Sequence, residues 1–168
     1  VPCDGFERGR NLDKIGMHAQ DTSELFFDNM RVPAANLLGD EGQGCAMLMT
    51  KLAHERMSQA VRSVAVAEAS LRNAIEYTKE RRAFGGTIAD FQNTQFVLAQ
   101  LDAEITAARV FTDWAVEQFM LDALDPLDAA RLKLVTCELQ GKVVDQCLQF
   151  FGGYGYMTEY PIARDVFK

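Results

Sequence analysis

The sequence predicts a mainly α-helical protein, in which an antiparallel up-and-down bundle follows a few short strands. From residue 45 onward, apolar residues recur at intervals of three and four positions, which is the helical period. The helical stretches are joined by short links, which favour antiparallel neighbours. Residues 1–44 differ, because short apolar runs alternate there with glycines and with two of the four prolines. We therefore expect two parts, residues 1–44 and residues 45–168.

Composition limits the classes of function. With 168 residues, 48% hydrophobic and 24% charged, the chain has the composition of an ordered globular protein. A formal net charge of −7 argues against nucleic-acid binding, which requires clustered lysines and arginines. The four cysteines form no C-x-x-C pair and only two histidines accompany them, so we expect a reducing compartment and no zinc site.

Membrane insertion is not expected either. The most apolar window, residues 60–69, contains Arg62 and Glu68, and no stretch reaches the 18 or more apolar residues of a membrane helix. The chain begins with neither an initiator methionine nor a basic leader. We expect it to be a piece of a longer protein.

The first part is predicted to contain a β-hairpin. Residues 22–27 and 30–32 are typical of short strands, and Asp28-Asn29 is typical of the turn between them. Pro33 would end the second strand because proline cannot donate a hydrogen bond to the ladder. A lone hairpin is only marginally stable, so we expect it to pair with further chain upstream.

Three long helices are predicted in the second part. The first covers residues 45–79 and closes with a basic cluster suited to the negative end of the helix dipole. Glycines at 85 and 86 end it, and the second helix follows over residues 89–120. The third covers residues 127–151 after Pro126, a residue that fits a first helical position. Three glycines within residues 152–155 end the third helix, and a fourth helix is expected to be cut off.

Glu55 is the first candidate for chemistry. If residues 45–79 are one helix, Leu48, Leu52, Glu55 and Gln59 share a face. A carboxyl held among leucines is desolvated, and desolvation raises the pKa of a carboxyl toward the range that is useful for a general base. An ordinary surface acid beside Arg56 is the alternative. Helix geometry alone leaves both open.

Three strings of residues, taken in order, point to a known family. The first is GMHAQDTSELFF at residues 16–27, followed by Val32-Pro33 and by LLG at 37–39. The second is ERRAFG at residues 80–85, followed by Phe91-Gln92, and the third is QFFGGYGY at residues 149–156, followed by EYP at 159–161. Together they resemble the acyl-CoA dehydrogenase family, most closely its long-chain type. The resemblance implies that residues 1–44 end the middle β-domain and that residues 45–168 form the C-terminal helical bundle domain, truncated before its last helices.

The resemblance also implies a cofactor, FAD. Arg81 and Gln92 match family positions that hold its pyrophosphate and adenosine side, with Phe84 packing nearby. Gln149, Gly152 and Gly153 match a second loop that contacts FAD. In the family these groups reach the flavin of a neighbouring subunit. Without the family, the sequence favours reading Gly152 as a helix C-terminal cap and Arg81 as a solvated charge.

A catalytic base follows from the same resemblance. Long-chain and isovaleryl-type members place it on the first helix of the C-terminal domain, where Glu55 falls. Most other members place it on a later loop that this sequence does not contain. Arg56 matches an arginine near the CoA part of the substrate, and His54 is left out of the chemistry.

The implied function is α,β-dehydrogenation of a long-chain or branched acyl-CoA to a trans-2-enoyl-CoA. The implied partners are an electron-transfer flavoprotein and further copies of the chain in a homotetramer. The location is the bacterial cytoplasm or, alternatively, the mitochondrial matrix. Two other functions stay open: an acyl-CoA oxidase-like or acyl-carrier-protein-directed relative, and a non-catalytic helical interaction module. Since most of the β-domain is absent, we expect this piece alone to be free of flavin and inactive.

Overall fold

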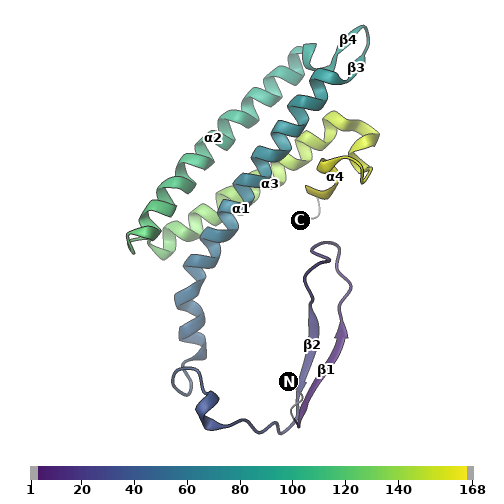
Figure 1. The fold of residues 1–168 in the computed structure, drawn as a ribbon. Coiled ribbons are helices and arrows are strands. Elements are labelled where there is room, and N and C mark those ends of the chain that lie inside the picture. Colours follow the sequence, from purple (N-terminus) through teal and green to yellow (C-terminus); the bar gives the residue numbers. More distant parts are fainter. Residues whose placement is uncertain (1–3, 166–168) are drawn as a thin grey trace. The chain divides into compact units, whose positions relative to one another are not determined.

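The computed structural model describes residues 4–165, and the chain divides into two compact units (Figure 1). The first extends to Leu48 and contains a β-hairpin. The second begins at Met49 and contains the helical bundle.

The first unit pairs strand β1 (Phe6–Asn11) with strand β2 (Ser23–Phe27) in an antiparallel sheet. The prediction of a strand at residues 30–32 is therefore wrong, since β2 finds its partner upstream and residues 30–33 have no regular structure. Gly5, which precedes β1, lies directly beside the turn that follows β2. A Cβ atom at Gly5 would lie 2.2 Å from the Asp28 carbonyl oxygen and 2.9 Å from the Met30 backbone. Chain near the start of β1 thus occupies the space beside the Asp28 turn.

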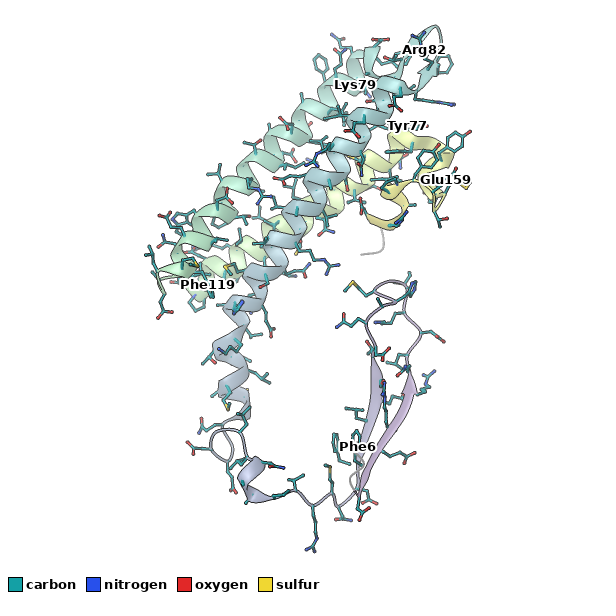
Figure 2. The ribbon with its side chains drawn as sticks, viewed as in Figure 1. Phe6, Tyr77, Lys79, Arg82, Phe119 and Glu159 are labelled. Carbon is teal, nitrogen blue, oxygen red and sulfur yellow. The ribbon has the colours of Figure 1, made fainter. Side chains whose placement is uncertain are left out.

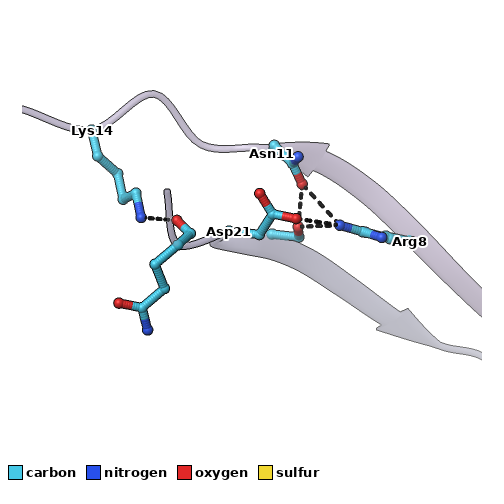
Figure 3. A network of polar contacts seen from close by, with 6 residues as sticks. Arg8, Asn11, Lys14 and Asp21 are labelled. Atoms are coloured by element: carbon cyan, nitrogen blue, oxygen red, sulfur yellow. Dashed lines mark hydrogen bonds and ion pairs between the residues drawn. The ribbon is translucent and has the colours of Figure 1, made fainter. Parts of the chain in front are cut away.

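Polar contacts close the long connection between β1 and β2 (Figure 3). Arg8 donates to Asn11 over 3.3 Å and contacts Asp21 over 3.5 Å. The Lys14 ammonium donates to two backbone carbonyls of the connection, those of Met17 and Gln20. All these groups are exposed, so each contact contributes little to stability. Together they hold the connection where the strand register shifts, between Arg8 and Asn11.

The second unit is an up-and-down arrangement of three long helices, as the sequence predicts (Figure 1). Their bounds lie within a few residues of those expected: α1 is Gly44–Glu80, α2 is Gln92–Met120 and α3 is Pro126–Phe151. Pro126 is the first residue of α3, and the Asp125 carboxylate caps that helix by accepting from the Leu127 amide over 2.7 Å. A short helix, α4 (Pro161–Asp165), follows. No helix within residues 4–165 is both long and apolar enough to cross a membrane.

Small residues allow the helices to pack closely. Along α1, buried positions alternate by three and four residues, and many are small: Met57, Ala60, Ser63, Val64, Ala67, Ser70, Leu71, Ala74 and Thr78. Leu101 and Ile105 of α2 and Val143 and Cys147 of α3 complete the core. In α3 the core includes Thr136, whereas its neighbour Val135 is 49% exposed. Thr136 is satisfied there because its hydroxyl donates to the Leu132 carbonyl over 2.8 Å.

Tight turns join the helices. Between α1 and α2, strands β3 (Arg82–Ala83) and β4 (Gly86–Thr87) form a hairpin. A 3-10 turn, η2 (Ile88–Asp90), follows it and delays the start of α2 by three residues relative to the prediction. After α3, a second 3-10 turn, η3 (Gly152–Tyr156), contains the predicted glycine break.

Candidate functional site

Glu55 lies in an open depression along α1. The cavity volume is about 590 Å³, and its lining comes from one helix face: Lys51, His54, Glu55, Ser58, Gln59 and Arg62. Glu55 is exposed, and within residues 4–165 no hydrogen bond or ion pair engages its carboxylate. The described residues therefore leave Glu55 as a solvated acid, without the apolar enclosure that would desolvate it. Its carboxylate is free to meet a ligand.

The neighbours of Glu55 have different surroundings. The centroid of the His54 ring lies 5.0 Å from that of the Phe119 ring, so His54 packs against α2 at this end of the bundle. Arg56 is half-buried and does not line the Glu55 depression. Successive helical residues are about 100° apart around the axis, which explains why Arg56 lies on a different face from Glu55.

A second pocket forms at the other end of the bundle, where the end of α1, the β3–β4 hairpin, the end of α3 and η3 meet. Its volume is about 540 Å³. Five of the six residues predicted to bind a cofactor line it: Arg81, Phe84, Gln149, Gly152 and Gly153. The sixth, Gln92, is the exposed first residue of α2 and does not line it. The fold thus brings together two strings that are far apart in sequence.

Arg81 supplies positive charge to this pocket. Its amide donates to the Tyr77 carbonyl over 2.8 Å and its carbonyl accepts from the Ile88 amide over 2.9 Å, so its backbone is fixed between helix and hairpin. Its guanidinium carbon lies 5.7 Å from the centroid of the Tyr154 ring. No carboxylate within the described part of the chain forms an ion pair with it. The charge is therefore available to an anion such as phosphate.

Aromatic rings form the floor of the pocket. Tyr77 stacks on Phe151 with centroids 4.2 Å apart, and Tyr160 packs against both Phe151 and Tyr154. Desolvation, aided by the nearby Glu159 carboxylate, raises the pKa of the Tyr160 hydroxyl above its usual 10.0. Tyr160 does not itself line the pocket, and it packs against two rings that do, those of Phe151 and Tyr154.

Two turns present unusual backbone to the pocket. Gly152 has φ 56° and ψ −134°, a conformation that is essentially restricted to glycine. A Cβ atom on Gly152 or Gly153 would meet nothing within 4 Å, so this edge is bare backbone that a ligand can approach closely. At the hairpin tip, Phe84 has φ 54° and is 95% exposed. A strained, exposed aromatic residue at a pocket is typical of a ligand contact.

Glu55 lies in the first third of α1, and the Arg81 pocket forms at the C-terminal end of that helix. Figure 2 shows Tyr77 and Arg82 at one end of the helical unit and Phe119, the ring partner of His54, at the other. Glu55 and Glu80, the last residue of α1, are 25 positions apart, which corresponds to about 37 Å of helix. These are two separate sites.

Apart from Phe84, the sequence did not predict the aromatic residues of the second pocket, among them Tyr77 and Tyr154. Tyr77 could have been found, because it precedes Arg81 by four positions and residues at that spacing are neighbours on a helix. Tyr154 lies inside the third string, where only the glycines and Gln149 were assigned. No three potential metal ligands come together within residues 4–165.

Comparisons with known proteins identify the family. A family model described as the C-terminal domain of acyl-CoA dehydrogenase matches residues 42–166, about three quarters of the chain. The chain belongs to the acyl-CoA dehydrogenase family. The resemblance of the three strings to this family is thereby confirmed. Members of this family are FAD-dependent flavoproteins. The second pocket fits such a cofactor, since it combines an arginine that has no ion-pair partner among residues 4–165, aromatic faces and bare glycine backbone.

Individual relatives differ in acyl-chain specificity. The mitochondrial long-chain specific acyl-CoA dehydrogenase of Sus scrofa is 43% identical over 95% of this chain. A short-chain specific acyl-CoA dehydrogenase of Megasphaera elsdenii is 39% identical over 95% of it. The solved acyl-CoA dehydrogenase of Geobacillus kaustophilus has a TM-score of 0.94 and 43% identity, and the match covers 98% of this chain and 43% of that one. The chain spans 37% and 42% of the two curated relatives, about two fifths of their length.

Proposed function

We propose that this chain is the C-terminal part of an FAD-dependent acyl-CoA dehydrogenase, which converts an acyl-CoA to a trans-2-enoyl-CoA. Residues 1–44 would close its β-domain and residues 45–168 would belong to its helical bundle domain. The observation that carries the proposal is the meeting of Arg81, Gln149 and Gly152 in one pocket. Two motifs that the family resemblance assigns to one cofactor thus line the same cavity, although neither motif alone requires it.

Glu55 is the proposed catalytic base. Its carboxylate is exposed and unpaired within residues 4–165, on a rigid helix, so a thioester in the depression could present its pro-R α-proton to it. Arg56 is proposed to contact the CoA part of the substrate. Bound FAD would supply the acceptor for the β-hydrogen, which leaves as hydride. The protein's task is then to hold the α-carbon within hydrogen-bonding reach of Glu55.

The second pocket is proposed to hold the pyrophosphate and adenosine side of FAD. The planar Arg81 guanidinium can bind phosphate oxygens bidentately. Phe84 supplies an aromatic ring and Gln149 a side-chain amide. Gly152 and Gly153 have no side chain, so the ligand can approach their backbone closely. Gln92 lies outside this pocket and would have to contact FAD beyond its rim.

The distance between the two sites supports a multimeric enzyme. Because about 37 Å of helix separates Glu55 from the end of α1, the FAD held by Arg81 cannot be the FAD that works with Glu55 of the same chain. We propose that the Arg81 pocket serves a neighbouring copy, within a homotetramer. Symmetric assembly would then complete every site with residues from two chains.

The decisive experiment replaces Glu55 by glutamine in the full-length protein. We expect turnover of acyl-CoA to fall by about 100-fold or more, because general-base catalysis is lost, while FAD stays bound. Glu138→Gln is the matched control, since Glu138 is an exposed acid on α3 that lines neither site. Normal turnover by the Glu55 variant would refute the assignment.

The finer assignments need separate measurements. We propose a long-chain or branched acyl group, an electron-transfer flavoprotein as acceptor and a bacterial cytoplasmic location, with the mitochondrial matrix as the alternative. A panel of acyl-CoA substrates, followed by anaerobic flavin bleaching, would rank chain lengths. Hydrogen peroxide released on substrate addition would favour an oxidase instead.

A further inference from the structure

We propose that Tyr154 is a positioning residue for the second pocket: its ring holds the Arg81 guanidinium in place to meet the phosphates of the ligand. The proposal rests on the proposed function, since it deepens the role given to Arg81. Tyr154 contacts Arg81, the proposed partner of the ligand's phosphates, and not the reacting atoms. Its effect on ligand binding should therefore act through Arg81.

The contact itself is the first argument. An exposed arginine has a long, flexible side chain, and fixing it costs conformational entropy when a ligand binds. The Arg81 guanidinium lies 5.7 Å from the Tyr154 centroid, within the range of a cation–π interaction. A carboxylate partner would compete with phosphate for the charge, whereas an aromatic face restrains the guanidinium and leaves that charge available.

Tyr154 is itself held firmly, which a positioning residue must be. Its carbonyl accepts from the Met157 amide over 3.0 Å, and its ring centroid lies 5.4 Å from that of Tyr160. The next residue, Gly155, is buried, and a Cβ atom there would lie 2.6 Å from Cδ1 of Leu148. The turn η3 is thereby packed directly onto α3, and it carries the Tyr154 ring with it.

Tyr156 offers a matched control. It lies on the same turn, is 73% exposed and does not line the pocket. Tyr154 is 44% exposed, so its ring is no core residue whose removal must unfold the bundle. Tyr154→Phe keeps the aromatic face and removes only the hydroxyl.

The first test observes Arg81 directly in this chain by NMR. The Tyr154 ring current should shift the Arg81 Hε resonance upfield. We expect Tyr154→Ala to abolish the shift, and Tyr154→Phe and Tyr156→Ala to preserve it. An Arg81 resonance that Tyr154→Ala leaves in place would overturn the proposal.

The second test measures FAD affinity of the full-length apoprotein by quenching of flavin fluorescence. Tyr154→Ala should weaken binding about two- to five-fold, the size of one exposed cation–π contact, and Tyr154→Phe should restore it. In an Arg81→Gln background, Tyr154→Ala should have no further effect. Additive losses would overturn the positioning role while leaving FAD as the ligand. A wild-type protein that binds no FAD would instead overturn the cofactor assignment, and the proposed role of Tyr154 with it.

Discussion

Single glycines have opposite roles in this chain, depending on what surrounds them. At Gly155 a side chain would strike both Cδ1 of Leu148, at 2.6 Å, and the Leu148 carbonyl oxygen, at 3.1 Å. At Gly141, in the middle of α3, a side chain would meet nothing within 4 Å. One glycine permits close packing, and the other only adds freedom to the unfolded chain.

Alanine substitutions at these two glycines should therefore change stability in opposite directions. Gly155→Ala should lower the free energy of unfolding by about 1–3 kcal/mol through overpacking. Gly141→Ala should raise it by roughly 0.5–1 kcal/mol through better helix propensity. Urea denaturation followed by circular dichroism measures both. Equal effects at the two positions would contradict the packing described for η3.

At the scale of single residues, the sequence predicted some features of the site and not others. The family strings predicted Arg81, Phe84 and Gln149 as partners, and the fold brings them to one pocket, but their roles stay predictions. The exposure of Glu55 could not be read from its leucine neighbours, because burial depends on what packs against a helix rather than on the helix itself. The contact between Arg81 and Tyr154 joins segments more than 70 residues apart, and no local pattern encodes it.

Ion pairs connect neighbouring helices. Arg109 of α2 donates to both oxygens of Glu68 of α1, over 2.8 and 2.7 Å, and Lys142 of α3 bonds Glu104 of α2 in the same manner. Both acids are only partly exposed. The hydrogen bonds from Arg109 lower the pKa of the Glu68 carboxyl below its usual 4.5, although desolvation opposes them.

This lowered pKa predicts how the α1–α2 contact depends on pH. A carboxyl with a depressed folded-state pKa stabilises the fold fully above its unfolded value of 4.5, and the stabilisation is lost as pH falls through the folded-state value. At pH 7, Glu68→Gln should lower the free energy of unfolding by up to about 1 kcal/mol. Urea titrations at pH 7 and pH 3 should show this difference shrinking in acid. Glu138→Gln, used as control, should show no such change, and a constant loss for Glu68→Gln would argue against the pair.

Elements differed in how well the sequence predicted them. The three long helices were found within a few residues, because a helix satisfies its own backbone and its period is local. The strand at residues 30–32 was wrong, because a strand needs a partner and the pattern did not indicate β1. Two tight turns, at Phe84-Gly85 and Gly152, were anticipated only as breaks. Their positive φ angles became evident from the structure.

At the scale of the whole molecule, the separation of the two sites predicts complementation between defective copies. Glu55→Gln and Arg81→Gln full-length variants should each be nearly inactive when expressed alone. Co-expressed in mixed assemblies, they should regain part of the activity, because some sites then combine an intact Glu55 from one chain with an intact Arg81 from another. Turnover of purified, doubly tagged assemblies measures this. No recovery would mean that each chain completes its own site.

Helix α1, which connects Glu55 with the Arg81 pocket, also constrains how this chain can change in evolution. Inserting or deleting one residue between Glu55 and Arg81 would turn one end of α1 by about 100° relative to the other and shift it by about 1.5 Å. Glu55 would then leave its face even though its neighbours in sequence stayed the same. Length variation should therefore accumulate in turns such as residues 121–125, while the stretch between the two sites stays constant in length.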